Sequence, residues 1–233
     1  MKADATALPY DLPGMIGPEL VIFDCDGVLI DSELIGARIE AAELGRIGIL
    51  VAESEILTRF LGMTAEAMYR ALEVEHRCAL PEGFAAAVQV EIDAAFERDL
   101  EAIPGIHEAL DRLRMASCVA SSSTLARLRH SLGLTGLYAR FAPHVFSAEQ
   151  VARGKPAPDL FLHAAAAMRC APARCLVIED SISGVRGAVA AGMRVWGFIG
   201  GGHCTDGHDA RLSEAGAEKV FKDMSDLPAL LGC

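Results

Sequence analysis

The chain has 233 residues, of which 52% are hydrophobic and 6% aromatic, and its formal net charge is −11. This length allows one large domain or two smaller ones. The acidic charge argues against a surface for nucleic acid or for an anionic membrane, because both need clustered positive charge.

Targeting signals and cysteine usage indicate a cytoplasmic protein. No apolar run reaches the roughly 20 residues that cross a bilayer, and the N-terminus lacks the charged and then apolar pattern of a secretion signal. The seven cysteines are scattered and form no CxxC pair, which favours free thiols in a reducing compartment. We therefore expect a cytoplasmic location, no membrane or nucleic-acid partner, and a monomer in preference to an oligomer.

The chain begins with a leader and a strand. Residues 1–18 contain several prolines and glycines without a sustained hydrophobic period, which predicts a loosely ordered leader. The apolar run from Leu20 to Phe23 then stops at Asp24 and Asp26, and Gly27 follows directly. This pattern predicts a buried strand whose carboxyl end delivers two carboxylates into a turn.

Residues 34–100 have the hydrophobic spacing of helices throughout. The clearest case is Pro81 to Leu100, where an apolar residue recurs every four positions from Phe84 onward. Thr64 is placed to cap another helix of this segment. An uninterrupted helical segment after the first strand predicts a small all-helical cap domain at 34–100, which leaves 19–33 and 101–233 for the core domain.

Strands and helices alternate in the rest of the chain. Short apolar runs typical of buried strands occur at 118–120, 145–146, 175–178, 194–199 and 219–221. Helical patterns separate most of them, so the predicted fold is α/β, with a Rossmann-like parallel sheet and right-handed crossovers.

Polar residues follow three of the predicted strands, and one lysine lies in a loop between them. These residues are Asp24, Asp26, Ser121, Ser122, Lys155, Glu179 and Asp180. Because the carboxyl ends of parallel strands share one edge of the sheet, we expect these side chains to form one site. Carboxylates bind Mg²⁺, hydroxyl and ammonium groups bind phosphoryl oxygens, and a carboxylate nucleophile beside a second carboxylate supports covalent phosphoryl transfer.

Four stretches at these positions resemble the motifs of the haloacid dehalogenase-like hydrolase superfamily, in its phosphatase-type branch with a helical cap after the first motif. They occur in the family order as Phe23–Val28, Val119–Ser121, Gly154–Pro156 and Ile178–Ser181. The resemblance extends over most of the chain after the leader. It implies a Mg²⁺-dependent phosphatase for a small phosphorylated metabolite. Within the family, the cap and the later motifs are most similar to sugar-phosphate phosphatases, including those that act on 6-phosphogluconate.

The resemblance also implies a role for each matching residue. Asp24 is the nucleophile that becomes phosphorylated, and Asp26 is the general acid and then the general base. The residues that contact the transferring phosphoryl group are Ser121, Ser122, Lys155 and Gly27. The Mg²⁺ ligands are Asp24, the backbone carbonyl of Asp26 and Asp180, with Glu179 as an outer-shell or additional ligand.

Substrate choice is expected to depend on the cap. A break between two cap helices, at Arg59, Gly62, Met63 and Thr64, is predicted to face the site. There Arg59 either meets an anionic group of the substrate or is a solvated helix charge. A sugar-acid phosphate needs a basic contact, for which Arg59 and Arg127 are the candidates. The stretch 200–208 contains glycines, two histidines and a cysteine in no known zinc spacing, and we interpret it as a flexible loop.

Two other functions stay open. A phosphosugar mutase of the β-phosphoglucomutase type shares the four motifs, but the histidine and the basic cap residue that are often found in mutases correspond here to Gly36 and Ala65. The other is a catalytically silent binding or regulatory module on the same fold, against which the intact set of site residues argues. A dinucleotide-binding oxidoreductase has less support, because no glycine-rich turn follows the first strand.

Overall fold

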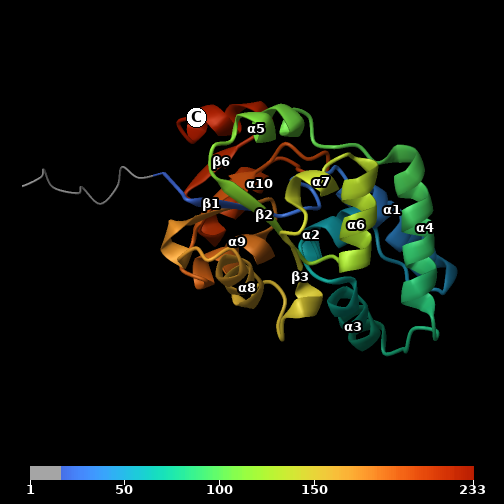
Figure 1. Ribbon diagram of the computed structural model, residues 1–233. Helices are drawn as coiled ribbons and strands as arrows, with labels where there is room; N and C mark the ends of the chain where they lie inside the picture. The colour runs from blue at the N-terminus through green and yellow to red at the C-terminus, as the bar shows by residue number, and fades with distance from the viewer. Residues whose placement is uncertain (1–16) are drawn as a thin grey trace, which may run out of the picture.

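A computed structural model describes residues 17–233, and all but the last two positions of the predicted leader lie outside the described residues. The centre of the molecule is a six-stranded parallel sheet with the strand order β3-β2-β1-β4-β5-β6 (Figure 1). Its strands are β1 Leu20–Phe23, β2 Ala116–Ser121, β3 Val145–Ser147, β4 Cys175–Glu179, β5 Arg194–Phe198 and β6 Lys219–Phe221. The predicted α/β fold with a parallel sheet is confirmed.

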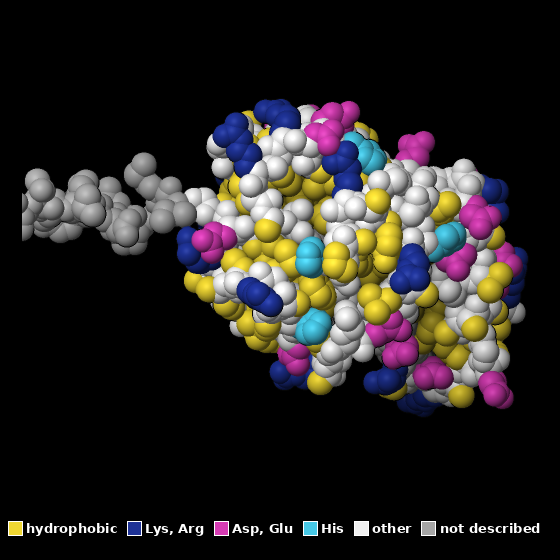
Figure 2. All heavy atoms as spheres, in the orientation of Figure 1, with side chains coloured by type: hydrophobic (Ala, Val, Ile, Leu, Met, Phe, Trp, Pro, Cys, Tyr) yellow, Lys and Arg dark blue, Asp and Glu magenta, His cyan; other side chains and the backbone are white. Residues whose placement is uncertain are grey.

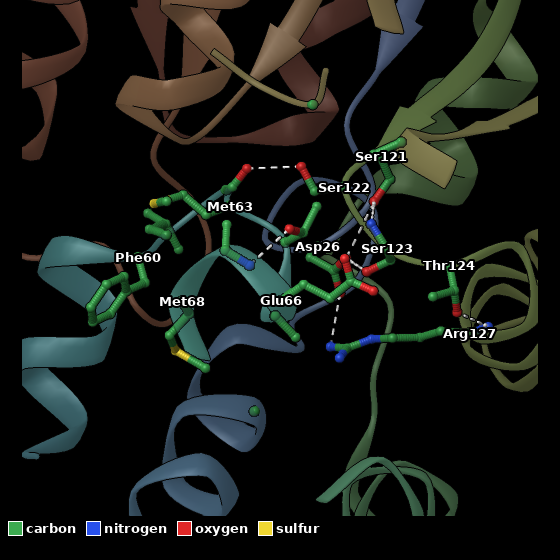
Figure 3. Close-up of a pocket in the computed structure, with 18 of the residues that line it drawn as sticks. Asp26, Phe60, Met63, Glu66, Met68, Ser121, Ser122, Ser123, Thr124 and Arg127 are labelled. Atoms are coloured by element: carbon green, nitrogen blue, oxygen red, sulfur yellow. Dashed lines mark hydrogen bonds and ion pairs between the residues drawn. The ribbon is translucent and has the colours of Figure 1, made fainter. Parts of the chain in front are cut away.

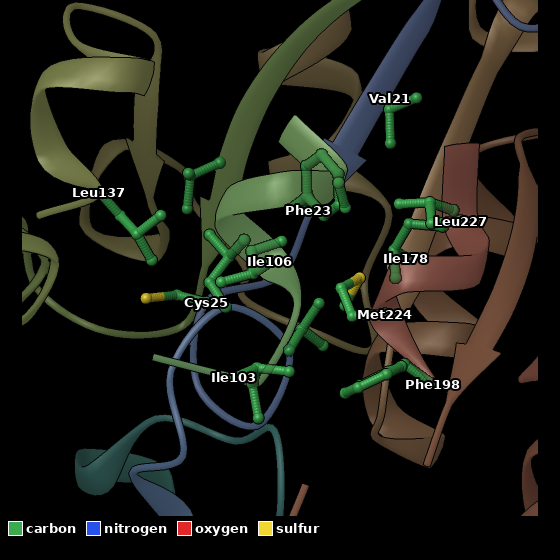
Figure 4. Packing of buried hydrophobic residues seen from close by; sticks show 14 of the residues in the cluster. Val21, Phe23, Cys25, Ile103, Ile106, Leu137, Ile178, Phe198, Met224 and Leu227 are labelled. Atoms are coloured by element: carbon green, nitrogen blue, oxygen red, sulfur yellow. The ribbon is translucent and has the colours of Figure 1, made fainter. Parts of the chain in front are cut away.

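The strand β1 is apolar over its whole length because helices cover both faces of the sheet. Successive side chains of a strand point to opposite faces, so Leu20 and Ile22 pack on one side while Val21 and Phe23 pack on the other. Figure 4 shows the second of these clusters, in which residues of α5 and of the C-terminal segment cover Phe23. The helices α8 and α9 belong to the first cluster and lie on the opposite side of the sheet (Figure 1).

The helices of the core connect the strands and extend to the C-terminus. They are α5 Ile106–Arg112, α6 Leu125–Leu134, α7 Tyr138–Phe141, α8 Asp159–Ala167, α9 Ile182–Ala190, α10 His208–Ala215 and α11 Leu227–Leu230, with short 3-10 helices at Ala148–Gln150, Pro172–Arg174 and Met224–Asp226. The short helices α7 and α11 and the helix α10 have no counterpart among the predicted elements.

The cap consists of four consecutive helices with a hydrophobic cluster of their own. They are α1 Glu33–Arg46, α2 Glu53–Arg59, α3 Ala65–His76 and α4 Phe84–Asp99. The four-residue period of α4 buries Phe84, Val88, Ile92 and Phe96, as the sequence predicts. Thr64 caps α3 as predicted, since its hydroxyl oxygen accepts a hydrogen bond of 3.2 Å from the backbone N–H of Ala67.

The register of the sheet places the strand ends at one level. Phe23 pairs with Val119 of β2 and with Ile178 of β4. The residues directly after these positions, Asp24 and Glu179, therefore leave the sheet side by side. On the face in Figure 2, Lys and Arg side chains are scattered among acidic and apolar ones. Within the described residues, no helix is long and apolar enough to cross a membrane.

Candidate active site

The strand ends and the cap enclose a cavity of about 690 Å³. Asp24, Asp26 and Ser121 line it from the sheet side, and Met63 and Met68 line it from the cap (Figure 3). The ends of β1 and β2 thus line one cavity below the cap, whereas Lys155, Glu179 and Asp180 contact or lie next to Asp24 but are not among the lining residues.

Lys155 lies between two buried carboxylates at the edge of the sheet. Its Nζ donates a hydrogen bond of 2.6 Å to Glu179 Oε1 and lies 2.8 Å from Asp24 Oδ1 in an ion pair. Burial alone would lower the pKa of Lys155, but the charges of Asp24 and Glu179 raise it well above its ordinary value. The lysine is therefore a permanent cation beside Asp24.

Glu179 is held by a full set of hydrogen bonds. Its Oε2 accepts from the backbone N–H of Ser181 at 2.7 Å and from the Ser181 hydroxyl at 2.9 Å, while Oε1 accepts from Lys155. Gly184 leaves room for this carboxylate, because a Cβ at position 184 would lie 1.6 Å from Glu179 Oε1. These contacts favour a role for Glu179 in anchoring Lys155 over a direct role at a metal.

A group of three carboxylates offers a site for a divalent cation. Ligand oxygens of Asp24, Glu179 and Asp180 all lie within 4.8 Å of one another. Asp24 Oδ1 lies 2.8 Å from Lys155 Nζ, and Asp180 Oδ2 lies 2.9 Å from His203 Nε2. Burial is the main cause that raises the pKa of both carboxyl groups well above the ordinary value. Buried carboxylates grouped in this way suit Mg²⁺, which binds one or two carboxylates and several further oxygens.

Asp26 is in a different environment, in which its carboxylate is well supplied with donors (Figure 3). Its oxygens accept hydrogen bonds from the hydroxyls of Ser32 at 2.6 Å and Ser123 at 2.7 Å, and Arg127 Nη2 lies 3.4 Å from Oδ1. Burial would raise the pKa of Asp26, but Arg127 and the two serines lower it below the ordinary value. The two aspartates of the first motif are therefore held in electrostatically opposite surroundings.

The serines after β2 differ in their contacts. Ser121 is buried, with its Oγ 3.5 Å from Asp26 Oδ2, and it accepts a hydrogen bond from the backbone N–H of Ser123. Ser122, predicted to bind phosphate, instead donates a hydrogen bond of 2.8 Å to the backbone carbonyl of Gly62 in the cap. The cap of the following helix is Thr124, not a serine of the motif.

Gly27 provides space for two side chains. Its φ of +76° lies in the left-handed region, and a Cβ there would lie 1.9 Å from Asp180 Oδ2 and 2.8 Å from His203 Cε1. The sequence predicts a glycine here so that the backbone can approach the phosphoryl group. The structure adds a second reason, which is that Asp180 and His203 occupy the space of a Cβ. Any larger residue at 27 would displace Asp180.

The stretch 200–207 is a loop, as predicted, and α10 begins at His208, but the two histidines of this stretch pack into the core. His203 and His208 are buried. His203 Nε2 lies 2.9 Å from Asp180 Oδ2, and His208 Nε2 lies 2.6 Å from the carbonyl oxygen of Asp180. His203, Cys204 and His208 form a compact group, but both ring nitrogens of His208 already have partners, Asp180 and Arg211. We interpret the histidines as support for Asp180. The signal in the sequence was their position after β5, at the same sheet edge.

The cap residues predicted to face the site divide into two groups. Gly62, Met63 and Thr64 line the cavity, and Arg59 does not. Arg59 is an exposed helix residue that forms ion pairs with Glu55 and Glu75. The solvated-charge interpretation of Arg59 therefore agrees with the structure, and the alternative of a substrate contact in this cavity does not.

Ser123 and Arg127 are cavity residues to which the sequence assigned no definite role. Both contact Asp26, and neither lies directly at a strand end. Arg127 reaches the cavity from the first turn of α6.

A parallel α/β sheet that gathers a lysine, carboxylates and a serine at one edge, beside a cavity under a helical cap, is the arrangement of a hydrolase of the phosphatase type. The family model of the haloacid dehalogenase-like hydrolases matches residues 18–192. The chain is 32% identical to 6-phosphogluconate phosphatase of Escherichia coli over 91% of this chain and 94% of the relative. It is 31% identical to a phosphorylated carbohydrates phosphatase of Thermotoga maritima, over 88% and 94% of the two chains.

A solved structure agrees closely with the fold. It is that of a conserved haloacid dehalogenase-like protein of unknown function from Agrobacterium tumefaciens, with a TM-score of 0.80 and 43% identity over 93% of this chain and 98% of that one. The chain belongs to the haloacid dehalogenase-like hydrolase family.

Proposed function

We propose that the protein is a Mg²⁺-dependent phosphatase that hydrolyses a small phosphorylated sugar or sugar acid through an aspartyl-phosphate. The observation that carries this proposal is the contact between Asp24 and Lys155 at the base of the cavity. A buried carboxylate beside a permanent cation is suited to attack a phosphoryl group whose charge the same cation neutralises.

Asp24 and Asp26 divide the chemistry between them. The negative charge of a bound phosphoryl group raises the pKa of Asp26, so Asp26 enters the reaction protonated. A carboxylate oxygen of Asp24 bonds to phosphorus while the bond from phosphorus to the ester oxygen breaks, and that oxygen takes the bonding electron pair and a proton from Asp26. A water molecule then attacks phosphorus, gives a proton to Asp26 and releases phosphate and the free Asp24 carboxylate. Asp26 returns to its protonated form at the end of the cycle.

The remaining residues position the phosphoryl group. Lys155 and Ser121 bind its oxygens, and the predicted Mg²⁺ ligands are Asp24, the Asp26 carbonyl and Asp180. When bound, Mg²⁺ supplies positive charge that offsets the charges of the carboxylates and of the phosphoryl oxygens. Glu179 holds Lys155 in place, and the cap, through Gly62, Met63 and Thr64, excludes water from above.

The substrate class rests on the cavity and on the relatives. A cavity of about 690 Å³ has room for a molecule of the size of a hexose phosphate. The positions Gly36 and Ala65, which correspond to functional side chains often found in mutases, both line this cavity. They carry neither an acid–base group nor a cation, which favours hydrolysis over a mutase reaction.

The proposal is tested by the release of inorganic phosphate from an aryl phosphate and from a panel of sugar phosphates and sugar-acid phosphates, with Mg²⁺ and with a chelator. We expect turnover that depends on Mg²⁺ and falls at least about 1,000-fold in Asp24→Asn. Turnover that survives in Asp24→Asn would remove the nucleophile assignment. Binding of the panel without any release of phosphate would favour the silent module.

A further inference from the structure

Arg127 enters the cavity from the core side and is fixed in direction. It lies in the first turn of α6, and its guanidinium carbon is 5.0 Å from the centre of the Phe96 ring of the cap helix α4. Its side chain is 19% exposed, and it faces Asp26 in Figure 3. Stacking on an aromatic ring holds a guanidinium plane in place while leaving its edge N–H groups free.

The donors of Arg127 are not saturated. Its contact with Asp26 Oδ1, at 3.4 Å, is longer than the 2.7–2.9 Å typical of a strong charge-assisted hydrogen bond. Asp26 already has shorter bonds, from Ser32 at 2.6 Å and from Ser123 at 2.7 Å. The buried Nε of Arg127 has no hydrogen-bond partner among residues 17–233. Because Nε is buried, a ligand in the cavity would meet the Nη groups of Arg127, and the contact of Nη2 with Asp26 is the long one of 3.4 Å.

The charge of the cavity makes Arg127 decisive for an anionic ligand. Six lining residues are acidic: Asp24, Asp26, Glu33, Glu40, Glu66 and Glu149. The basic lining residues are Arg70, which is exposed, and Arg127, which is partly buried. Within this mainly acidic lining, Arg127 is the partly buried basic partner with which a substrate carboxylate can pair.

We infer that Arg127 binds the carboxylate of a phosphorylated sugar acid and gives such substrates preference over the matching neutral sugar phosphates. The inference rests on the proposed function for the placement of the phosphoryl group at Asp24. The guanidinium forms two parallel hydrogen bonds with the carboxylate, and Phe96 keeps its plane fixed. Arg127 thus determines substrate specificity, and the chemical steps proposed for Asp24 and Asp26 stay the same.

Two pairs of compounds that differ in a single carboxylate test this inference. They are 6-phosphogluconate against glucitol 6-phosphate, and 3-phosphoglycerate against glycerol 3-phosphate. Binding is measured by calorimetry with Mg²⁺ in the Asp24→Asn background, where no turnover interferes. For at least one pair, we expect the acid to bind about tenfold or more tightly than its neutral partner, because hydrogen bonds between charged groups contribute about that much.

Variants of two arginines of α6 test whether Arg127 causes the preference for the acid. Arg127→Met keeps much of the aliphatic stem over Phe96 and should bring the ratio of the two affinities close to one, while Arg127→Lys should keep part of it. Arg129→Met removes an equal charge from α6 at an exposed position outside the cavity, and it should keep the full ratio. Because the affinities for the acid and for its neutral partner are compared within each variant, a general loss of affinity or a smaller folded fraction affects both equally and leaves their ratio unchanged.

The outcomes separate this inference from the proposed function. A ratio near one in both pairs for the unsubstituted Arg127, or a ratio that Arg127→Met leaves unchanged, overturns the inference whatever the turnover. Acid preference that depends on Arg127, together with no phosphate release by the wild type, supports the inference and overturns the proposed function. The ratio of kcat/KM values within each pair should follow the affinities when both hold.

Discussion

At the scale of single residues, the site depends on glycines as much as on charged groups. Glu179 can anchor Lys155 only because position 184 has no side chain, and Asp180 can approach the turn after β1 only because position 27 has none. Both glycines are ordinary members of a turn or helix in the sequence. Their function becomes clear from the side chains that occupy the space where a Cβ would be.

The first prediction compares two helical glycines, Gly184 in the first turn of α9 and Gly133 in the last turn of α6. A Cβ in Gly184→Ala would overlap Glu179, so we expect a loss of about 1–3 kcal/mol in unfolding free energy and a fall in kcat as Lys155 moves. Gly133→Ala in α6 meets no atom within 4 Å and should stabilise the protein by about 0.5–1 kcal/mol. Urea unfolding measures both, and equal midpoints for the two variants would contradict the assignment of Gly184.

At the scale of elements, the cap and the core meet at Gly62. This glycine has a φ of +75°, its carbonyl accepts the hydrogen bond from Ser122, and a Cβ there would lie 2.1 Å from Ser181 Oγ. Ser181 in turn bonds Glu179, so the cap rests directly on the residue that orders the lysine anchor. Closure of the cap and order in the site are therefore mechanically linked.

The second prediction compares two cap glycines, Gly62 and Gly48, that both have a left-handed backbone conformation. Gly62→Ala should lower kcat/KM by about tenfold or more, because the added Cβ keeps the cap from closing on Ser181. Gly48→Ala has an equally left-handed φ, of +87°, but meets nothing within 4 Å. Both variants should lose about 1 kcal/mol of stability from backbone strain. Steady-state kinetics decide the matter, and equal rates in the two variants would show that closure does not depend on this contact.

The arrangement of strands and helices explains which site residues can be predicted from the sequence and which cannot. Asp24 and Asp180 are identifiable because each directly follows a buried apolar strand, and neighbouring parallel strands bring their ends together. Arg59 and Arg127 are both helix arginines near apolar residues, so local pattern does not separate them. Only the packing of α4 against α6, and the ion pairs of Arg59, direct one into the cavity and the other to the surface. His203 was missed because its burial depends on contacts with Gly27, 176 positions earlier.

At the scale of the whole molecule, the protein combines a large acidic excess with carboxylates that are buried in its core. The net charge is −11, and Asp24 and Asp180 are buried side by side at the sheet edge. Burial and neighbouring Asp26 also raise the pKa of Glu33 to about 8. A fold that buries carboxylates in this way holds protons which the unfolded chain releases at lower pH, so its stability is tied to both pH and metal.

The third prediction follows from the sign of these shifts. Between the ordinary carboxyl pKa of about 4 and the raised values, the folded state binds more protons than the unfolded state, so the unfolding free energy falls as pH rises. Asp26 contributes the opposite sign, since its pKa is lowered, but only at acidic pH. We therefore expect the metal-free protein to lose stability from pH 5 to pH 8, measured by thermal unfolding in a chelator.

Added Mg²⁺ should reverse this loss, because cations compete with protons for Asp24 and Asp180 and bind the folded state alone. The rise in melting temperature on adding Mg²⁺ should accordingly be larger at pH 8 than at pH 5.5. In Asp180→Asn, which removes one ligand and one of the raised carboxyl groups, both the Mg²⁺ effect and the pH dependence should shrink together. A Mg²⁺ effect independent of pH, or one that survives in Asp180→Asn, would place the cation elsewhere on this acidic molecule. Their joint loss would tie the stability of the whole fold to the two carboxylates that the sheet brings together.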